Sequence, residues 1–573
     1  MKLSPNAELV FYDRYALHEK ETWEEAALRV AQAVAKAEAD KEKIERWTEK
    51  FAEIIAEQYF LPGGRILRNA GRSKRLNLFN CFTLPPVEDN IESIGETMKN
   101  ALICWSYGGG IGIDWSNLRP KGAPLLSKGG KSSGLVSFIR SLDYIGQTIE
   151  TGGSRRSGAL AIVSAQHPEV LDFIEAKVKH GELSAHNISV GVTYEFLEAV
   201  DQDEEWILEF GGKEYLRLPA RELWNKILDN MLQSAEPGLI NYTNIRKNNS
   251  YYFAPIAGCN LCGELPLSAF EGCCLGALVL PRFVQGTQTN WKKMEEVIWT
   301  AVRFLDNVID VNYYFLPQIE EVSKQGRRIG LGVMGLADYL FAKQIRYGSE
   351  RSVEEVSRLF RFIRDTAYQA SIALAQEKVP FPKFDRFEYL KASFIRKLPP
   401  SLRMDIKKYS IRNVTLMACA PTGTISLLAD VTSGVEPLFA KAYRREDRIG
   451  ARVYIHPLYK KFLQEGEIPD WFVDTYDISP REHLEVQVTI QKYVDGSISK
   501  TLNLPATTTV EELSELFLEY FFDLKGITVY RDRCRPEQVL YHVSEKEARE
   551  FLEQADERAD EETIQCRSGV CEL

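Results

Sequence analysis

The feature that most constrains the fold is a series of short apolar segments between about residues 76 and 540, separated by longer helical stretches. The segments read LNLFNCFTL, LAIVSA, ISVGVTYEF, ALVLPRF, LGVMGLA, VTLMACAP, ISLLADV and ISKTLNLP. Helix start signals lie between them, including the capping boxes Ser352–Glu355 and Thr509–Glu512. Strands that alternate with helices predict an α/β fold with a largely parallel sheet. Periodicity alone does not distinguish an open sheet from a closed barrel.

The two ends of the chain differ from this central part. Residues 1–75 are predicted to be helical, with a capping box at Thr22 and Glu25 and a later apolar stripe at three- and four-residue spacing. Residues 541–573 are predicted to form a charged helix, from Ser544 to Asp560, followed by a polar terminus. We therefore expect a helical region over 1–75, an α/β domain over 76–540 and a tail over 541–573.

Composition and charge exclude several classes of protein. The 573-residue chain has a formal net charge of −10, whereas a general nucleic-acid binder needs a basic surface. No segment approaches the roughly 18 apolar residues of a membrane span, and Glu8 and Asp13 interrupt the N-terminal region where a secretory signal needs an apolar run. We therefore expect a cytoplasmic protein with neither a nucleic-acid nor a membrane partner. Its ten cysteines are then expected to include metal ligands or redox-active thiols rather than a disulfide framework.

Four of these cysteines fall in one short segment, CNLCGELPLSAFEGCCLG, at positions 259, 262, 273 and 274. A zinc site on Cys259 and Cys262 would lack the second Cys-x-x-Cys pair that most structural zinc sites have. A thioredoxin-like motif should open a helix directly after a strand, whereas Gly-Glu-Leu-Pro after Cys262 is a poor helix start. The third interpretation is radical thiol chemistry at Cys262, with the amide of Asn260 and the carboxylate of Glu264 beside it.

The segment Asn260-x-Cys262-Gly263-Glu264, followed by Cys273, resembles the active-site loop of ribonucleotide reductase large subunits. Further segments that are similar to this family, in the family's order between about residues 60 and 540, are Phe79–Phe82, Gly108–Gly112, Ser116–Pro120, Gly152–Ala159 with His167-Pro168, Ala420–Ser426, Ser499–Pro505 and Gly526–Arg531. Several matching segments in the family's order identify a family far more specifically than one segment does.

This resemblance implies a ten-stranded α/β barrel that holds the Cys262 loop inside and reduces ribonucleoside di- or triphosphates to 2′-deoxyribonucleotides. Cys262 would carry a thiyl radical, which suits the task because its S–H bond is close in strength to the ribose C3′–H bond. Glu264 would accept the 3′-hydroxyl proton, and Asn260 would orient the ribose hydroxyls. Cys81 and Cys273 would supply the reducing equivalents and end as a disulfide.

The resemblance also implies how the enzyme binds and recycles. Cys566 and Cys571 would relay reducing equivalents from a thioredoxin- or glutaredoxin-type protein to the buried pair by thiol–disulfide exchange. Substrate would contact Asn80, Gly109, Pro421, Thr422, Gly423, Thr424 and Ile425, where a Gly-containing turn ahead of a helix suits a diphosphate. A dNTP or ATP effector would contact Asp89, Arg155, Arg156 and Ser157. A homodimer is implied, and no metal ligand is assigned in this chain.

The radical source is assigned by residue matching. The segment Phe60–Leu67 and the ending Thr528–Arg531 look most similar to the adenosylcobalamin-dependent branch of the family. Val529 precedes Tyr530, so the chain lacks the two adjacent tyrosines of the branch that uses a separate radical-generating subunit. That branch remains the alternative, because its tails also carry a Cys-x4-Cys pair. Buried structural thiols are the expectation for Cys104, Cys419 and Cys534, and helix capping for His167.

Overall fold

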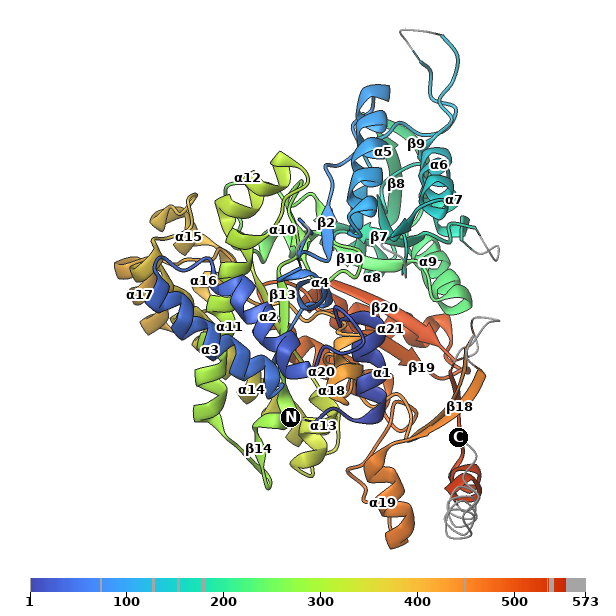
Figure 1. Cartoon of the computed structure of the whole chain (residues 1–573). Coiled ribbons are helices and arrows are strands. Elements are labelled where there is room, and N and C mark those ends of the chain that lie inside the picture. Colours follow the sequence, from blue (N-terminus) through green and yellow to red (C-terminus); the bar gives the residue numbers. More distant parts are fainter. Residues whose placement is uncertain are drawn as a thin grey trace.

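The computed structural model describes residues 2–552, except for 73–74, 126–128, 152–154, 178–181, 448–449, 533 and 535–539. Figure 1 shows a mixed α/β molecule with helices packed around its strands. The largest sheet runs in the order β19 (Thr501–Leu504), β20 (Gly526–Arg531), β10 (Gly238–Asn241), β7 (His186–Val192), β6 (Ala159–Ser164), β3 (Gly110–Asp114) and β2 (Cys81–Thr83). Every neighbouring pair is parallel except β10 with β20. The predicted largely parallel sheet is confirmed.

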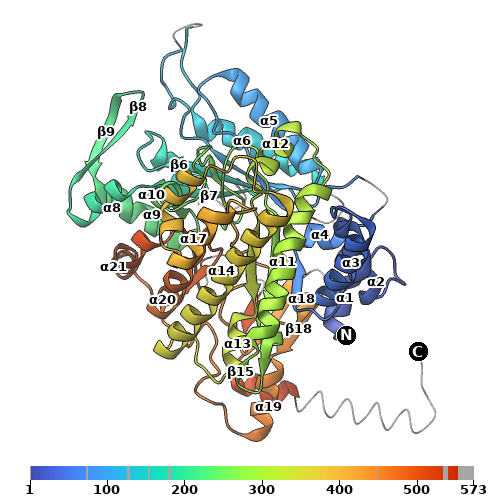
Figure 2. The same ribbon diagram turned by 90° about the vertical axis from the view of Figure 1, so that its left-hand side faces the viewer.

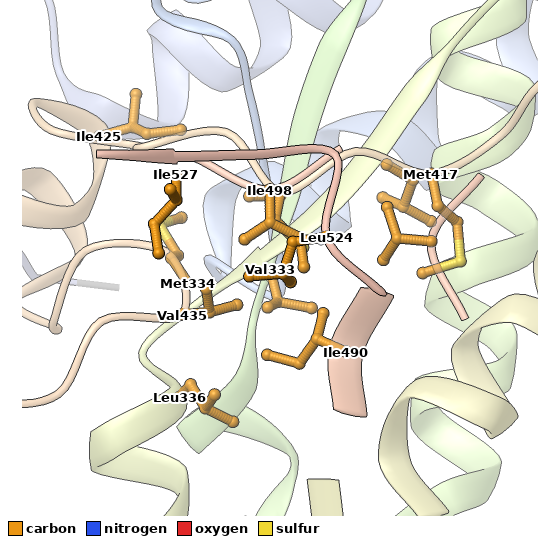
Figure 3. Close-up of a cluster of buried hydrophobic side chains, with 14 of the residues drawn as sticks. Val333, Met334, Leu336, Met417, Ile425, Val435, Ile490, Ile498, Leu524 and Ile527 are labelled. Atoms are coloured by element: carbon orange, nitrogen blue, oxygen red, sulfur yellow. The ribbon is translucent and has the colours of Figure 1, made fainter. Parts of the chain in front are cut away.

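A second sheet holds β13 (Leu275–Val279) between β1 (Phe60–Pro62) and β16 (Gly330–Met334). β13 pairs antiparallel with β1 and parallel with β16. All residues of β13 and β16 are buried, as expected for strands covered on both faces. Isolated bridges extend from both sheets, at Phe82↔Gly272, Leu331↔Met417 and Cys419↔Ile498. Figure 3 shows the apolar core where β16 meets residues from distant parts of the chain, among them Met417, Ile490, Ile498 and Ile527.

The first part of the chain is mostly helical. It forms α1 (Pro5–Arg14), α2 (Trp23–Ala35), α3 (Lys41–Ala56) and α4 (Gly64–Asn69). The prediction of a helical region over 1–75 missed β1, which lies between α3 and α4 and pairs with β13. The capping box at Thr22 and Glu25 is present at the start of α2. Helices α2 and α3 pack on each other and on the long helix α11 (Trp291–Val311), so this region is anchored to the helices that cover the sheets (Figure 2).

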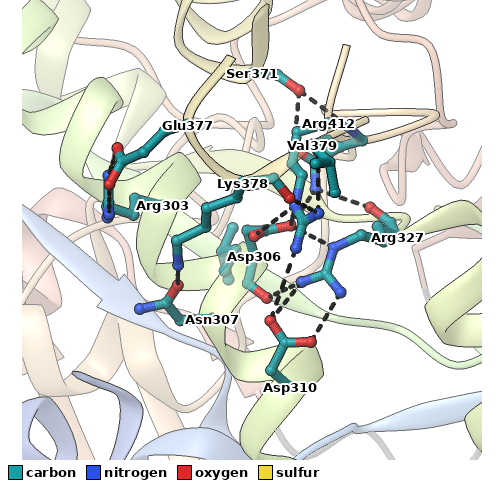
Figure 4. Close-up of polar contacts among 12 residues, drawn as sticks. Arg303, Asp306, Asn307, Asp310, Arg327, Ser371, Glu377, Lys378, Val379 and Arg412 are labelled. Atoms are coloured by element: carbon teal, nitrogen blue, oxygen red, sulfur yellow. Dashed lines mark hydrogen bonds and ion pairs between the residues drawn. The ribbon is translucent and has the colours of Figure 1, made fainter. Parts of the chain in front are cut away.

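Buried ion pairs reinforce that contact, and Figure 4 shows those that join α11 to later segments of the chain. Arg303 of α11 donates to both carboxylate oxygens of Glu38, at 2.8 and 2.6 Å. It also pairs with Glu377 near the end of α14 (Glu350–Lys378). In a neighbouring cluster, the carboxylate of Asp306 forms ion pairs with Arg327 at 2.8 Å and with Arg412 at 3.1 Å. Because each buried charge has an opposite partner, these groups link α11, α14 and the N-terminal region without an unpaired buried ion.

The remaining elements surround these sheets. The helices are α5 (Ile91–Ser106), α6 (Leu135–Gln147), α7 (Val170–Glu175), α8 (Tyr194–Asp201), α9 (Ala220–Ser234), α10 (Tyr242–Lys247), α12 (Pro317–Gly326), α13 (Leu336–Ala342), α15 (Arg386–Lys391), α16 (Ser393–Arg396), α17 (Pro400–Tyr409), α18 (Ile425–Ala429), α19 (Pro457–Glu465), α20 (Pro480–Gln491) and α21 (Val510–Tyr520). The small strand pairs are β4 (Glu150–Thr151) with β5 (Arg155–Arg156), β8 (Glu205–Phe210) with β9 (Lys213–Pro219), β11 (Gly258–Cys259) with β12 (Pro266–Leu267), and β14 (Val284–Gln285) with β15 (Gln288–Thr289). β17 (Ala442–Asp447) lies between β18 (Gly450–Ile455) and β21 (Leu540–His542).

Three local predictions need correction or completion. ISLLADV contains the short helix α18 rather than a strand. Ser352 is not an N-cap, because α14 begins one turn earlier at Ser349, whose hydroxyl accepts from the N–H of Ser352. The capping box at Thr509 and Glu512 is confirmed. Residues 545–552 are helical, and the rest of the predicted terminal helix lies outside the described residues. None of the described helices has the length and apolar character needed to cross a bilayer.

Candidate active site

A cavity of about 330 Å³ lies between the two sheets and the N-terminal helices. Among the residues that line it are Asn80 and Cys81, Gly109, Cys262 and Glu264, and the whole segment 421–425. These residues are far apart in the sequence, and the fold brings them to one partly open cavity. Most of the residues predicted to bind and reduce substrate therefore line a single cavity.

Cys262 lies in the turn of the hairpin formed by β11 and β12, where Cys259 pairs with Pro266. Gly263 adopts a φ of +77° and donates its N–H to the carbonyl oxygen of Asn260 over 3.0 Å. The hairpin lies directly against β3, since a Cβ on Gly112 would stand 1.7 Å from the carbonyl oxygen of Cys259. Glycine at that position is what allows the loop to approach the sheet. Cys262 is half-buried and faces the cavity.

Cys81 and Cys273 form the second thiol group, on adjacent backbone segments. The thiols of Cys262 and Cys273 hydrogen-bond to the sulfur of Cys81 and hold the pKa of Cys81 well below its ordinary value. Burial raises the pKa of Cys273 well above its ordinary value, and its contact with Cys81 adds to that rise. Both side chains are reduced thiols. One cysteine of the pair is thus poised as a hydrogen-bond acceptor and the other as a donor.

Glu264 and Asn260 are buried polar residues with unused hydrogen-bonding capacity. Glu264 is 2% exposed, and burial, reinforced by the charge of Cys81, raises its pKa to about 8. Asn260 accepts from the N–H of Leu265 through Oδ1 over 3.0 Å. Within the described residues, Nδ2 of Asn260 and Oε2 of Glu264 have no hydrogen-bond partner. Buried polar atoms are normally paired, so these two atoms mark a place for polar groups of a ligand.

The segment 421–425 forms a tight turn at the start of α18. Thr422 adopts a φ of +49°, and its hydroxyl accepts from the N–H of Gly434 over 2.7 Å. Its carbonyl oxygen accepts from the N–H of Ser426 over 2.9 Å. Gly423 is exposed, and a Cβ there would meet no atom within 4 Å. The backbone of the turn is therefore open to a ligand in the cavity.

Four polar lining residues were missed from the sequence: Arg14, Tyr15, Arg65 and Arg68. They come from α1, the residue after it, and α4. Arg65 stands in the segment Phe60–Leu67 that carries the family resemblance, but nothing in the spacing of the other three assigns them to the cavity. Their position depends on how the N-terminal helices pack.

Of the predicted effector residues, Asp89 and Ser157 do not line this cavity. Asp89 accepts from the backbone N–H and Nε of Arg119, at 3.1 and 2.9 Å. Ser157 is buried, and its hydroxyl donates to the carbonyl oxygen of Ile149 over 3.0 Å. Arg155 and Arg156 form β5, and their side chains lie outside what the structure describes. Cys566 and Cys571 also lie outside the described residues.

The zinc and thioredoxin-like interpretations fail on the position of Cys259. Its side chain is packed among Leu160, Ile162 and Tyr242, whereas Cys262 faces the cavity. Across the described residues, no group of three or more possible metal ligands is found. The two cysteines therefore do not point to a common site.

The other residues singled out in the sequence occupy positions that suit a structural role. Cys104, Cys274 and Cys419 are buried, and Cys534 is half-buried. His167 accepts from the N–H of Glu169 over 3.0 Å at the start of α7, in line with the capping role expected for it. Burial lowers its pKa to about 4.

Comparison with known proteins agrees with the geometry. A family profile described as "Ribonucleotide reductase, barrel domain" matches residues 79–530, and one described as "Ribonucleotide reductase, all-alpha domain" matches residues 1–75. A "Vitamin B12-dependent ribonucleoside-diphosphate reductase" of Mycobacterium tuberculosis is 37% identical, over 97% of this chain and 81% of its own length. A protein of the same description from Thermoplasma acidophilum is 36% identical, over 86% of this chain and 66% of its own length. A "Ribonucleoside-diphosphate reductase subunit alpha" of Chlamydia trachomatis is 27% identical, over 88% of this chain and 56% of its own length.

Proposed function

The chain belongs to the ribonucleotide reductase family and reduces ribonucleotides, and from that premise we propose that it does so through a thiyl radical on Cys262 with adenosylcobalamin as the radical source. One observation supports the mechanism in this proposal. The cavity brings the half-buried Cys262, the thiol of Cys81, the unpartnered carboxylate oxygen of Glu264 and the turn 421–425 into contact with one ligand-sized space. Cys273 is buried beside Cys81 and does not itself line that space.

The proposed reaction balances with two thiols consumed per turnover. The Cys262 radical takes the hydrogen atom from C3′ of the ribose, while Glu264 accepts the 3′-hydroxyl proton. The 2′-hydroxyl then leaves as water, with a proton from the cysteine pair. Cys81 and Cys273 together give two electrons and two protons and form a disulfide, with one proton leaving in the water and the other hydrogen going to C2′. Glu264 returns its proton to the 3′-oxygen, and the Cys262 thiol returns its hydrogen atom to C3′. The net change is a ribonucleotide and two thiols to a deoxyribonucleotide, a disulfide and water.

Glu264 and Asn260 suit the roles proposed for them. A general base works best when its pKa lies near the working pH, and the pKa of Glu264 is raised to about 8 by burial. The unpartnered Nδ2 of Asn260 would donate to a ribose hydroxyl and hold the sugar in register with Cys262. Asn80 and Gly109 would shape the wall beside the sugar, and the turn from Pro421 to Ile425 would bind the phosphates.

The cofactor proposal rests on the access to Cys262 and on the relatives named for vitamin B12. When bound, adenosylcobalamin supplies an unpaired electron at the sulfur of Cys262. Cys262 is half-buried and lines the cavity, so its sulfur can be reached from that side. A cavity of about 330 Å³ suits a nucleotide, so the bulk of such a cofactor would rest outside it. The alternative source remains a separate metal-containing radical-generating subunit.

Further parts of the proposal follow the family. We expect a homodimer that binds a dNTP or ATP effector near Asp89, Arg155, Arg156 and Ser157. Cys566 and Cys571 would carry electrons from a thioredoxin- or glutaredoxin-type reductant, which suits a cytoplasmic location. The isolated bridges that extend from the two sheets support a ten-stranded barrel. The three regions 1–75, 76–540 and 541–573 would act as the helical, catalytic and redox-tail parts.

The decisive experiment is deoxynucleotide formation by the purified full chain, with a ribonucleotide, a dithiol and an effector, with and without adenosylcobalamin. Activity that depends on the cofactor is expected. Activity that appears only when a second protein from the same source is added would replace the cobalamin proposal with the two-subunit alternative.

A further inference from the structure

Three arginine side chains line the cavity on the side of the N-terminal helices. Arg14 is the last residue of α1, and Arg65 and Arg68 lie one turn apart in α4. Among the described residues that line the cavity, Glu264 is the only carboxylate. The cavity therefore has a cationic wall, formed by Arg14, Arg65 and Arg68, in addition to its thiols and its carboxylate.

The cationic wall belongs to the same part of the cavity as the turn 421–425. Helix α1 packs against α18, and the two helices lie side by side in Figures 1 and 2. α18 begins directly after Thr424. The packing of α1 on α18 thus places the helix that carries Arg14 next to the turn proposed to bind phosphate.

Arg65 is held in place by a glycine. Its guanidinium donates to the carbonyl oxygen of Gly108, and a Cβ on Gly108 would stand 2.2 Å from its Nη2 atom. Gly108 also has a φ of +77°, which favours glycine. The backbone at Gly108 therefore leaves room for the guanidinium at the cavity edge.

The three guanidinium groups of the cationic wall are half-buried at one cavity. Arg14 pairs with Asp13, whose side chain is 67% exposed, so that a ligand could compete with this pairing. Several guanidinium groups gathered in a half-buried place favour an anionic ligand, and the planar guanidinium suits phosphate oxygens in particular.

We propose that Arg14, Arg65 and Arg68 bind the phosphate of the substrate that lies farthest from the ribose. This inference rests on the proposed function, since it takes the turn 421–425 as the site of the inner phosphates. The turn offers uncharged N–H and hydroxyl groups, whereas the cationic wall offers full charges. Affinity should then increase with the number of phosphates on the nucleotide.

The test compares one nucleoside as its mono-, di- and triphosphate in the wild-type chain and in Arg14→Met and Arg68→Met. A charge-assisted hydrogen bond contributes about 1.5–3 kcal/mol, or roughly ten- to a hundredfold in affinity. We expect the dissociation constants of the di- and triphosphate, measured at equilibrium, to rise by about tenfold in each variant, with little change for the monophosphate. Arg217→Met, which removes a charge from the exposed hairpin β8–β9, is the matched control. A change of the same size for all three nucleotides, or no change for any of them, would overturn the inference.

A second measurement separates this inference from the proposed reaction. Inorganic tripolyphosphate is titrated calorimetrically into the full chain, without turnover. The wild type and Arg217→Met should bind it alike, and Arg14→Met and Arg68→Met more weakly by about tenfold. Equal binding by all four proteins would overturn the cationic wall as a phosphate site even if reductase activity is present. Weaker binding in the two wall variants would support it even if the radical source proves to be different.

Discussion

The backbone N–H of Cys273 donates to the carbonyl oxygen of Cys81 over 2.9 Å. Together with the bridge between Phe82 and Gly272, this bond aligns two cysteines that are almost two hundred positions apart in the sequence. A rigid backbone pairing of this kind lets the two sulfurs exchange hydrogen bonds as thiols and approach each other as a disulfide with little movement of the chain.

The first prediction concerns these two thiols. In the absence of external reductant, one turnover should convert two thiols of the wild-type chain to a disulfide. Cys81→Ser and Cys273→Ser should form no disulfide and lower deoxynucleotide formation by at least about a thousandfold, because the reducing pair is incomplete. Thiol titration and product analysis after a single turnover measure both. Cys104→Ser, a buried cysteine outside the cavity, should behave as the wild type.

The tail cysteines make a separate prediction. Cys566→Ser and Cys571→Ser should complete a first turnover and then stop when a thioredoxin-type protein is the reductant, because the buried pair cannot be reached directly. The disulfide between Cys81 and Cys273 should accumulate and be found by peptide mapping. Sustained turnover in both variants would exclude the relay.

Cys262 and Cys259 are predicted to respond in opposite ways. Cys262→Ala should abolish deoxynucleotide formation while ribonucleotide binding, measured at equilibrium, is retained. Cys259→Ala should keep the activity, since its thiol packs against apolar side chains away from the cavity. Deoxynucleotide formation by Cys262→Ala would contradict the thiyl-radical mechanism.

The buried carboxyl group of Glu264 is predicted to lower the free energy of unfolding as pH rises. Its pKa is raised to about 8 in the folded chain by burial, above the value of about 4.3 for an exposed glutamate. Between these two values the unfolded chain binds fewer protons, so the free energy of unfolding falls as pH rises, by at most about 1.4 kcal/mol per pH unit. Glu264→Gln should lose this dependence and be more stable than the wild type at pH 8 in denaturant melts. The same variant should be inactive, whereas wild-type kcat/KM should rise with pH up to about 8.

The close approach of the hairpin to β3 gives a packing prediction. Gly112→Ala places a Cβ against the carbonyl oxygen of Cys259, so either the strand or the loop must move. We expect a loss of about 1–3 kcal/mol in the free energy of unfolding and a fall in kcat, because the loop carries Cys262. Gly95→Ala, in α5 with no atom within 4 Å of the new Cβ, should instead stabilise the chain by about 0.5–1 kcal/mol.

The buried ion pair between Arg303 and Glu38 gives the last prediction. Both side chains are at most 5% exposed, and Arg303→Met leaves the Glu38 carboxylate with Lys378 and Asn307 as remaining partners. The expected loss is about 1–3 kcal/mol in the free energy of unfolding, measured by chemical denaturation. Arg217→Met, at an exposed position, should leave the denaturation midpoint unchanged.

The local sequence determined many of the secondary-structure elements and the family of this protein. Helix start signals located α2 and α21, apolar segments located the buried strands, and the motif around Cys262 identified both the family and the reaction. It did not determine that ISLLADV contains a helix. A short apolar segment is too short to show a helical or strand periodicity, so its secondary structure depends on the turn before it. Nor did it reveal the pairing of Arg303 with Glu38.

Tertiary structure alone decided which of these residues meet. The contact of Cys81 with Cys273, the approach of the Cys262 loop to Gly112 and the placing of Arg14, Arg65 and Arg68 in the cavity all join segments from different parts of the chain. Such contacts depend on strand order and on how helices pack, which a local pattern of residues does not encode. The raised pKa of Glu264 has the same origin, because only the folded chain removes that carboxylate from water.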